Sequence, residues 1–304
     1  MILVVDLNPY VTKQYKTEKI EFSKINTVEE KITQPIGVGI KASLLFSEFD
    51  KYPIFMSFTG GYNGELIKDY LRKRAIRSET IDMRDDTSEL MMLESKDKKV
   101  YFMTQNARLS RDELDKFYYE FSKISRESEY VCLLGSKYNM ESERFAENII
   151  RIADKENAKL AVCVDNQSPK SVMDSKPYLA ILKKSQLEEI ANQNLELEMQ
   201  ITKIAKSYID KGVGVIGVFD SNRFLLIDDK NGYRVPLKLT EKMVIDRSMV
   251  TAGYIIASTR DFDMPTTIKF ALACGMSKVY SREHFDSAEI KKIMNEIEVE
   301  RFNL

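Results

Sequence analysis

The sequence is poor in the residue types that build most metal and disulfide sites. Among its 304 residues it has one histidine and three cysteines. Cys132, Cys163 and Cys274 are far apart and lie among apolar residues, which predicts buried thiols in a reducing compartment. His284 follows Ser-Arg-Glu in a polar stretch, so we expect it at the surface. No zinc site or other metal site is predicted.

The chain also lacks long hydrophobic runs and an excess of charge of one sign. No stretch approaches the roughly 18 apolar residues of a membrane span, and the N-terminus begins with an apolar strand instead of a targeting segment. Lysine and arginine number 46, against 47 aspartates and glutamates, and the two signs are interspersed. Nucleic acid and membranes are therefore not expected as partners. We expect a cytoplasmic protein that binds small molecules or proteins.

Hydrophobic residues make up 43% of the chain, which is enough for a substantial core. Short apolar runs, such as residues 2–5 and 54–58, indicate strands that are buried on both faces of a sheet. From residue 110 onwards, predicted helices alternate with predicted strands, which favours an α/β fold with a mostly parallel central sheet. The predicted helices are 40–47, 65–74, 110–122, 142–156, 185–192, 195–211, 248–259, 266–275 and 287–298. The later predicted strands are 130–134, 160–164, 179–182 and a hairpin-like pair, 214–219 and 223–227.

Two segments near the N-terminus interrupt this pattern. Residues 10–33 alternate β-branched or aromatic residues with polar ones, and residues 88–95 and 100–105 flank a polar tip as in a β-hairpin. Such half-exposed strands predict a small, separate sheet. We therefore expect one α/β domain over residues 1–304, with a β-lid inserted at about 10–35 and 86–106.

Several short motifs follow one another in a recognisable order. The most specific is residues 58–65, Phe-Thr-Gly-Gly-Tyr-Asn-Gly-Glu. The others are Val-Asp-Leu-Asn-Pro at 5–9, Gly-Val-Gly-Ile-Lys at 37–41, Leu-Gly-Ser at 134–136 and Lys-Pro-Tyr-Leu at 176–179. In this order they resemble the motifs of the ribokinase/PfkB family of sugar kinases, in particular its 1-phosphofructokinase and tagatose-6-phosphate kinase branch. The resemblance covers nearly the whole chain and implies a ribokinase-like three-layer α/β sandwich with a small β-lid.

The family's catalytic motif is present here only in altered form. In the family, a Gly-Ala-Gly-Asp turn opens a helix that continues Ser-Met-Val-Ala-Gly; its glycines let N–H groups approach a phosphate, and its Asp deprotonates the sugar hydroxyl. Here Val244, Ile245 and Arg247 surround Asp246. An alignment on Ser-Met-Val makes Asp246 the catalytic base, whereas an alignment on Ala-Gly places Ser248 there. Asp246 is alternatively a helix N-cap without a catalytic role.

Other ligand-binding positions of the family are also replaced. Thr12 stands in place of a sugar-binding Asp, Lys41 in place of an Asn, and Ser88 in place of the lid Arg that would pair with a phosphate. Lys41 either binds an anionic ligand or is a solvated helix residue, and Asp165 either faces the substrate or caps a turn. The resemblance implies a substrate site at Asn8, Thr12, Gly37, Gly39, Lys41, Ser88, Gly135 and Asp165. It implies a nucleotide site at Lys183, Gly217, Asp220 and Arg247.

These replacements predict a catalytically impaired protein, because phosphoryl transfer depends on positioning and on neutralising charge. We expect a pseudokinase that acts by binding or regulation, with a sugar phosphate or another anionic metabolite as its ligand. The alternative is a divergent active kinase that transfers the γ-phosphate of Mg-ATP to a ketohexose phosphate such as fructose 1-phosphate or tagatose 6-phosphate. Mg-ATP is the cofactor only in that case. A homodimer through the apolar face of the β-lid, which includes Leu90, Met92, Tyr101 and Met103, is also expected.

Overall fold

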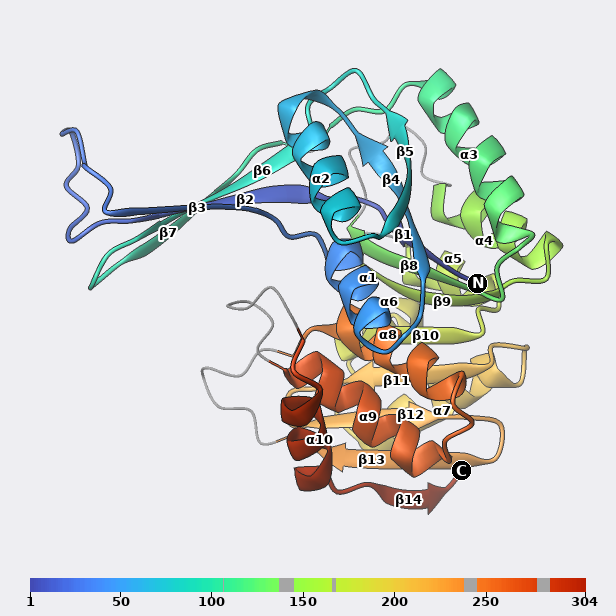
Figure 1. Ribbon diagram of the computed structural model, residues 1–304. Helices are drawn as coiled ribbons and strands as arrows, with labels where there is room; N and C mark the ends of the chain where they lie inside the picture. Colours follow the sequence, from blue (N-terminus) through green and yellow to red (C-terminus); the bar gives the residue numbers. More distant parts are fainter. Residues whose placement is uncertain (106, 137–144, 166–167, 238–244, 278–284) are drawn as a thin grey trace.

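The computed structural model describes residues 1–304 except 106, 137–144, 166–167, 238–244 and 278–284 (Figure 1). His284 and Val244 therefore lie outside the described residues. The strands of the main sheet are β1 (Ile2–Asp6), β4 (Pro53–Thr59), β5 (Arg77–Asp82), β8 (Tyr130–Ser136), β9 (Lys159–Asp165), β10 (Leu179–Lys183), β11 (Val215–Phe219), β12 (Arg223–Ile227), β13 (Asn231–Pro236) and β14 (Glu300–Asn303). This ten-stranded sheet has the order β14-β13-β12-β11-β10-β9-β8-β1-β4-β5.

Most of the sheet is parallel. All neighbouring pairs from β5 to β11 run parallel, whereas β12, β13 and β14 add antiparallel strands at one edge. β1 lies between β8 and β4, and all five of its residues are buried. The prediction of an α/β fold with a mostly parallel central sheet is confirmed.

Helices cover both faces of this sheet (Figure 1). The helices are α1 (Val38–Glu48), α2 (Gly61–Lys73), α3 (Arg111–Ser125), α4 (Phe145–Lys155), α5 (Pro169–Asp174), α6 (Lys184–Ala191), α7 (Glu198–Ile209), α8 (Arg247–Ser258), α9 (Met264–Met276) and α10 (Ser287–Glu296). Successive residues of a strand point to opposite faces. Accordingly, Ile2 and Val4 share a core with α1, α8 and α9, whereas Leu3 and Val5 share a core with α3 and α4.

A second, smaller sheet projects away from the main body (Figure 1). Its strands are β2 (Tyr10–Lys16), β3 (Glu30–Pro35), β6 (Ser88–Glu94) and β7 (Lys99–Met103), in the order β3-β2-β6-β7. β2 follows β1 directly and β6 follows β5, so both leave the main sheet at the carboxyl ends of parallel strands. The small sheet therefore begins beside the edge where ligands of open α/β folds bind.

The sequence pattern missed short elements that have little apolar character. β5 and β14 are the two edge strands, and none of their residues is fully buried. No helix in the described part of the chain has the length and hydrophobicity that a membrane span needs. Cys132, Cys163 and Cys274 are buried and free, which confirms the prediction of buried thiols.

Candidate functional site

Several of the predicted site residues lie where parallel strands end and helices begin. β1 ends at Asp6, β9 at Asp165 and β10 at Lys183, and β8 lies between β1 and β9. The carboxyl ends of parallel strands share one edge of the sheet. α1 and α8 begin at this same edge and pack against each other.

Lys41 and Asp246 form a nearly buried ion pair between α1 and α8. The Lys41 ammonium contacts Oδ2 of Asp246, and the side chains are only 6% and 13% exposed. Lys41 is therefore not the solvated helix lysine of the alternative interpretation. A buried pair of this kind is stable only while both charges are present, because either charge alone would be costly to desolvate.

Asp246 is also the N-cap of α8. Its Oδ1 accepts hydrogen bonds from the backbone N–H groups of Ser248 (3.1 Å) and Met249 (3.4 Å). A helix N-terminus attracts anions through its unpaired N–H groups and its dipole, and here the chain's own carboxylate occupies that position. Ser248 lies within the helix and is 6% exposed. The N-cap interpretation of Asp246 is confirmed, while a role as base stays a prediction for both residues.

A second ion pair links the start of α8 to the ends of β9 and β10. Nη2 of Arg247 lies 2.8 Å from both carboxylate oxygens of Asp165, and Nζ of Lys183 lies 3.1 Å from Oδ1. Gln186 accepts a longer bond from Arg247, at 3.4 Å. Burial raises the pKa of Asp165, but Arg247 and Lys183 more than offset this and hold it below its ordinary value. The structure thus brings one predicted substrate residue together with two predicted nucleotide residues.

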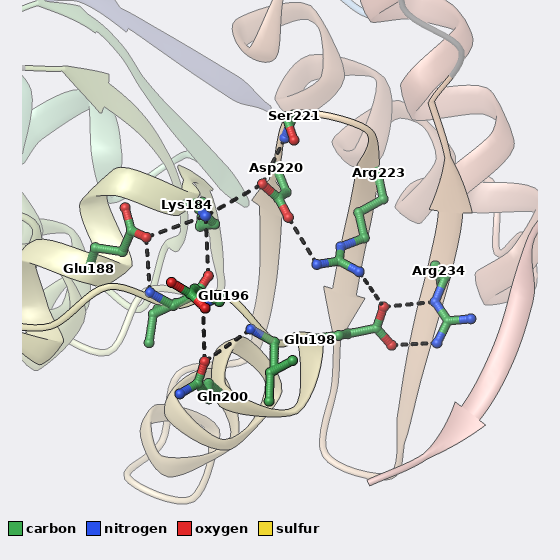
Figure 2. Close-up of polar contacts among 11 residues, drawn as sticks. Lys184, Glu188, Glu196, Glu198, Gln200, Asp220, Ser221, Arg223 and Arg234 are labelled. Atoms are coloured by element: carbon green, nitrogen blue, oxygen red, sulfur yellow. Dashed lines mark hydrogen bonds and ion pairs between the residues drawn. The ribbon is translucent and has the colours of Figure 1, made fainter.

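The other two predicted nucleotide residues take part in packing and in a charge network. Gly217 lies inside β11, where a Cβ would come within 2.6 Å of Ile181. Asp220 accepts a hydrogen bond from Arg223 (3.0 Å) and lies 3.8 Å from Lys184. Figure 2 shows how this network continues from Arg223 through Glu198 to Arg234. It ties α6 and α7 to β12 and β13, and nucleotide binding by Gly217 and Asp220 stays a prediction.

The remaining substrate candidates lie where the small sheet meets the main sheet. The hydroxyl of Ser88 donates to Oδ1 of Asn8 at 3.4 Å, and Ser88 and Thr12 are both buried. The neighbouring Glu89 is paired with Lys13 at 2.5 Å. The negative charge beside Ser88 is therefore neutralised within the small sheet itself.

Gly37, Gly39 and Gly135 surround a residue that the sequence did not single out, Asp6. The Asp6 side chain is 1% exposed and accepts hydrogen bonds from the N–H groups of Gly39 (2.8 Å) and Asn8 (3.1 Å). Burial raises its pKa to about 6, although both bonds and the charge of Lys41 oppose the shift. The signal available in the sequence was a carboxylate at the end of an otherwise apolar strand.

Asp6 should make stability depend on pH. Its folded pKa of about 6 exceeds its ordinary value of 3.8, so the folded state binds the proton more tightly. Proton binding by Asp6 therefore adds to the free energy of unfolding below about pH 4, and this stabilisation is lost as the pH rises through 6. At pH 7 the ionised carboxylate lowers the free energy of unfolding by about 3 kcal/mol relative to the protonated form. Between pH 4 and pH 7, Asp6→Asn should therefore gain stability relative to the wild type. Urea unfolding over this range checks the prediction, and parallel stability curves would contradict it.

No known protein-family model matches the chain. Full-length relatives nevertheless exist: the 1-phosphofructokinase of Bacillus subtilis is 21% identical over 304 residues, which cover 99% of this chain and 100% of the relative. The 1-phosphofructokinase of Borreliella burgdorferi is 22% identical, with coverage of 99% and 98%. A tagatose-6-phosphate kinase of Staphylococcus epidermidis is 20% identical over 209 residues, which cover 68% of this chain and 67% of the relative.

Solved structures agree with these relatives. Phosphofructokinase-2 of Escherichia coli, in a tetrameric inhibited form, superimposes with a TM-score of 0.83 at 17% identity and covers 97% of this chain and 98% of its own. The same enzyme in complex with fructose-6-phosphate gives a TM-score of 0.81 at 16% identity, with coverage of 97% and 98%. The chain therefore has the fold of ribokinase-like PfkB kinases and homologues named 1-phosphofructokinase and tagatose-6-phosphate kinase. The predicted resemblance is confirmed.

Proposed function

We propose that this homologue of sugar-phosphate kinases is catalytically impaired and acts as a binding or regulatory pseudokinase. One observation carries the proposal: the site neutralises its own charges. Asp246 pairs with Lys41 and caps α8, and Asp165 pairs with Arg247 and Lys183. A phosphate that entered would compete with two carboxylates for the same cations and N–H groups.

This competition bears directly on catalysis. Phosphoryl transfer proceeds mainly through donors and cations already aimed at the charge of the transition state. Loss of a single such donor typically costs on the order of 10²- to 10³-fold in rate. The α8 N-terminus and Arg247 are both engaged by carboxylates here, so the combined loss supports impairment. We propose that the site instead binds a sugar phosphate or another anionic metabolite weakly enough to leave these pairs in place.

The second candidate function is a divergent active kinase. Its support is the position of Asp246, which stands at the start of a helix at the carboxyl edge of the sheet. In that case Asp246 would deprotonate the acceptor hydroxyl of fructose 1-phosphate or tagatose 6-phosphate, with Mg-ATP as phosphoryl donor. Lys41 would first have to move away from Asp246, since its ammonium contacts the Asp246 carboxylate.

A coupled kinase assay and a thermal-shift panel separate the two functions. We expect no turnover above background with Mg-ATP and either ketohexose phosphate, and no shift with millimolar ATP, because a bound ligand stabilises by RT ln(1 + [L]/Kd). The 1-phosphofructokinase of Bacillus subtilis is a suitable positive control. Turnover by the wild type that Asp246→Asn abolishes would establish the active alternative and overturn the pseudokinase.

We also propose a cytoplasmic homodimer that pairs through the small sheet. Its edge strand β7 exposes apolar side chains, with Tyr101 at 56% and Met103 at 46% exposure, and a small sheet needs a covering layer. Tyr101→Glu with Met103→Lys should convert the dimer to a monomer. Sedimentation equilibrium measures this, and a wild-type protein that is monomeric at micromolar concentration would contradict the pairing.

A further inference from the structure

The edge strand β5 has one open side. It lies at one end of the main sheet, and in the described part of the chain β4 is the only strand that pairs with it (Figure 1). The N–H of Met83 donates to the Thr59 carbonyl of β4 (2.9 Å), and the backbone groups of successive residues alternate between the two sides of a strand. Ser78, Thr80 and Asp82 therefore turn their N–H and C=O groups away from β4. An edge of this kind can accept a further strand.

The surface beside this edge is hollowed. An open hollow of about 550 Å³ lies between α2 and β5. Its lining includes Lys68 and Arg72 of α2 and Arg77, Ser78 and Thr80 of β5. None of the six residues of β5 is fully buried. The hollow therefore leaves room for an extended chain alongside the strand.

The lining of the hollow carries more positive than negative charge. Lys68, Arg72 and Arg77 are basic, and Asp82 is the one acidic residue among those that line it. Charged side chains on an edge strand usually hinder the addition of another strand. Here Ser78 and Thr80, which present their backbone groups outward, are short and uncharged. The positive charges lie to the sides of the edge, where they favour a partner of opposite sign.

The ion pairs already present around the hollow are exposed. Arg72 lies 2.5 Å from Asp69, and Arg77 lies 2.9 Å from Glu79. The two arginine side chains are 79% and 63% exposed. Exposed pairs of this kind typically contribute only about 0–1 kcal/mol. Carboxylates of an incoming chain can therefore replace these partners at little cost in stability.

The sign of the charge also decides which chain fits the edge. A second copy that paired through its own β5 would bring two sets of Lys68, Arg72 and Arg77 together, and like charges across a strand pair are destabilising. We propose that β5 instead accepts an acidic, extended segment of a partner protein, which adds to the main sheet as a strand. Main-chain hydrogen bonds would supply affinity, and contacts of its carboxylates with the three basic side chains would supply specificity.

Fluorescence anisotropy with a labelled six-residue peptide, the length of β5, tests the proposal on the full chain. The peptide alternates Glu with Val. We expect saturable binding that weakens in high salt. A peptide that alternates Lys with Val should bind roughly tenfold or more weakly. The Glu peptide N-methylated at two adjacent central residues should lose affinity by a similar factor, because neither of its edges can then pair fully.

Variants of the chain locate the binding at β5. Arg72→Glu with Arg77→Glu should weaken binding of the Glu peptide roughly tenfold or more. Lys170→Glu with Lys230→Glu changes the net charge equally on other surfaces, where these side chains are 66% and 79% exposed, and should leave the affinity unchanged. Thr80→Pro removes one outward N–H and keeps the N–H donors that face β4, so it should also abolish binding. If Thr80→Pro does not fold, the N-methylated peptide decides the matter.

Three results would overturn the proposal. They are no binding of the Glu peptide at millimolar concentration, equal binding of the N-methylated peptide, and binding that Arg72→Glu with Arg77→Glu leaves unchanged. A single-stranded oligonucleotide that binds as tightly as the Glu peptide would show a surface for polyanions in general, which also overturns strand addition. The measurement involves no nucleotide cofactor and no sugar phosphate, so its outcome is independent of the proposed function.

Discussion

Replacing Lys41 by alanine should lower the free energy of unfolding by about 3–5 kcal/mol, the usual cost of removing one partner of a buried ion pair. The Asp246 side chain is 13% exposed in the wild type, and in the variant its carboxylate would lose the counter-charge of Lys41 while keeping the N–H groups of α8. Because Lys41 lies where two helices pack, water cannot easily replace it. Urea unfolding followed by circular dichroism measures the loss as a shift in midpoint at constant slope.

Two further variants make this result interpretable. Lys41→Met combined with Asp246→Asn removes both charges and should recover most of the stability, because a pair of similar volume without charge avoids the desolvation cost. Lys68→Ala breaks a pair with Asp82, whose side chain is 82% exposed, and should cost less than about 1 kcal/mol. A loss from Lys41→Ala as small as that from Lys68→Ala would mean that the pair with Asp246 is effectively solvated.

The sequence predicts those strands of the fold that are buried on both faces, because such strands consist almost entirely of apolar residues. β1 and β4 are buried along their whole length, so their sequences are continuous apolar runs that identify them without any further information. β5 and β14 border solvent at the two ends of the sheet and carry charged residues, so their sequences resemble loops. Only pairing with a neighbouring strand defines them as strands, and one sequence does not reveal that pairing.

The site was predictable as a set of positions but not as a set of contacts. The motif resemblance identified Lys41, Asp165, Asp246 and Arg247 individually. Lys41 and Asp246 are 205 residues apart in the sequence, and Asp165 and Arg247 are 82 apart. Their pairing depends on strand order and on the packing of α1 against α8, which short motifs do not encode. Asp6 was not predicted for a related reason. Its contacts involve Gly37, Gly39 and Gly135, which lie next to it only in the folded chain.

The Arg247–Asp165 contact offers the most direct test of whether the site blocks itself. Asp165→Asn removes the charge that holds Arg247 and Lys183, while the amide keeps the volume and a hydrogen-bond acceptor. Arg247 is 13% exposed, so its guanidinium would then lie in the site with an unbalanced charge. Hydrogen bonds to charged groups contribute about 1.5–3 kcal/mol, so affinity for inorganic phosphate should rise roughly tenfold or more.

Isothermal titration with inorganic phosphate measures this gain, and its loss in high salt would identify it as electrostatic. Asp174→Asn is the matched control, since it also removes a carboxylate from a lysine, Lys170, but at the surface, where both side chains are 45% or more exposed. It should leave phosphate affinity unchanged. Equal affinities for wild type and Asp165→Asn would mean that Asp165 does not exclude anions. The proposed impairment would then have to come from the start of α8, where Asp246 occupies N–H groups that a phosphate would need.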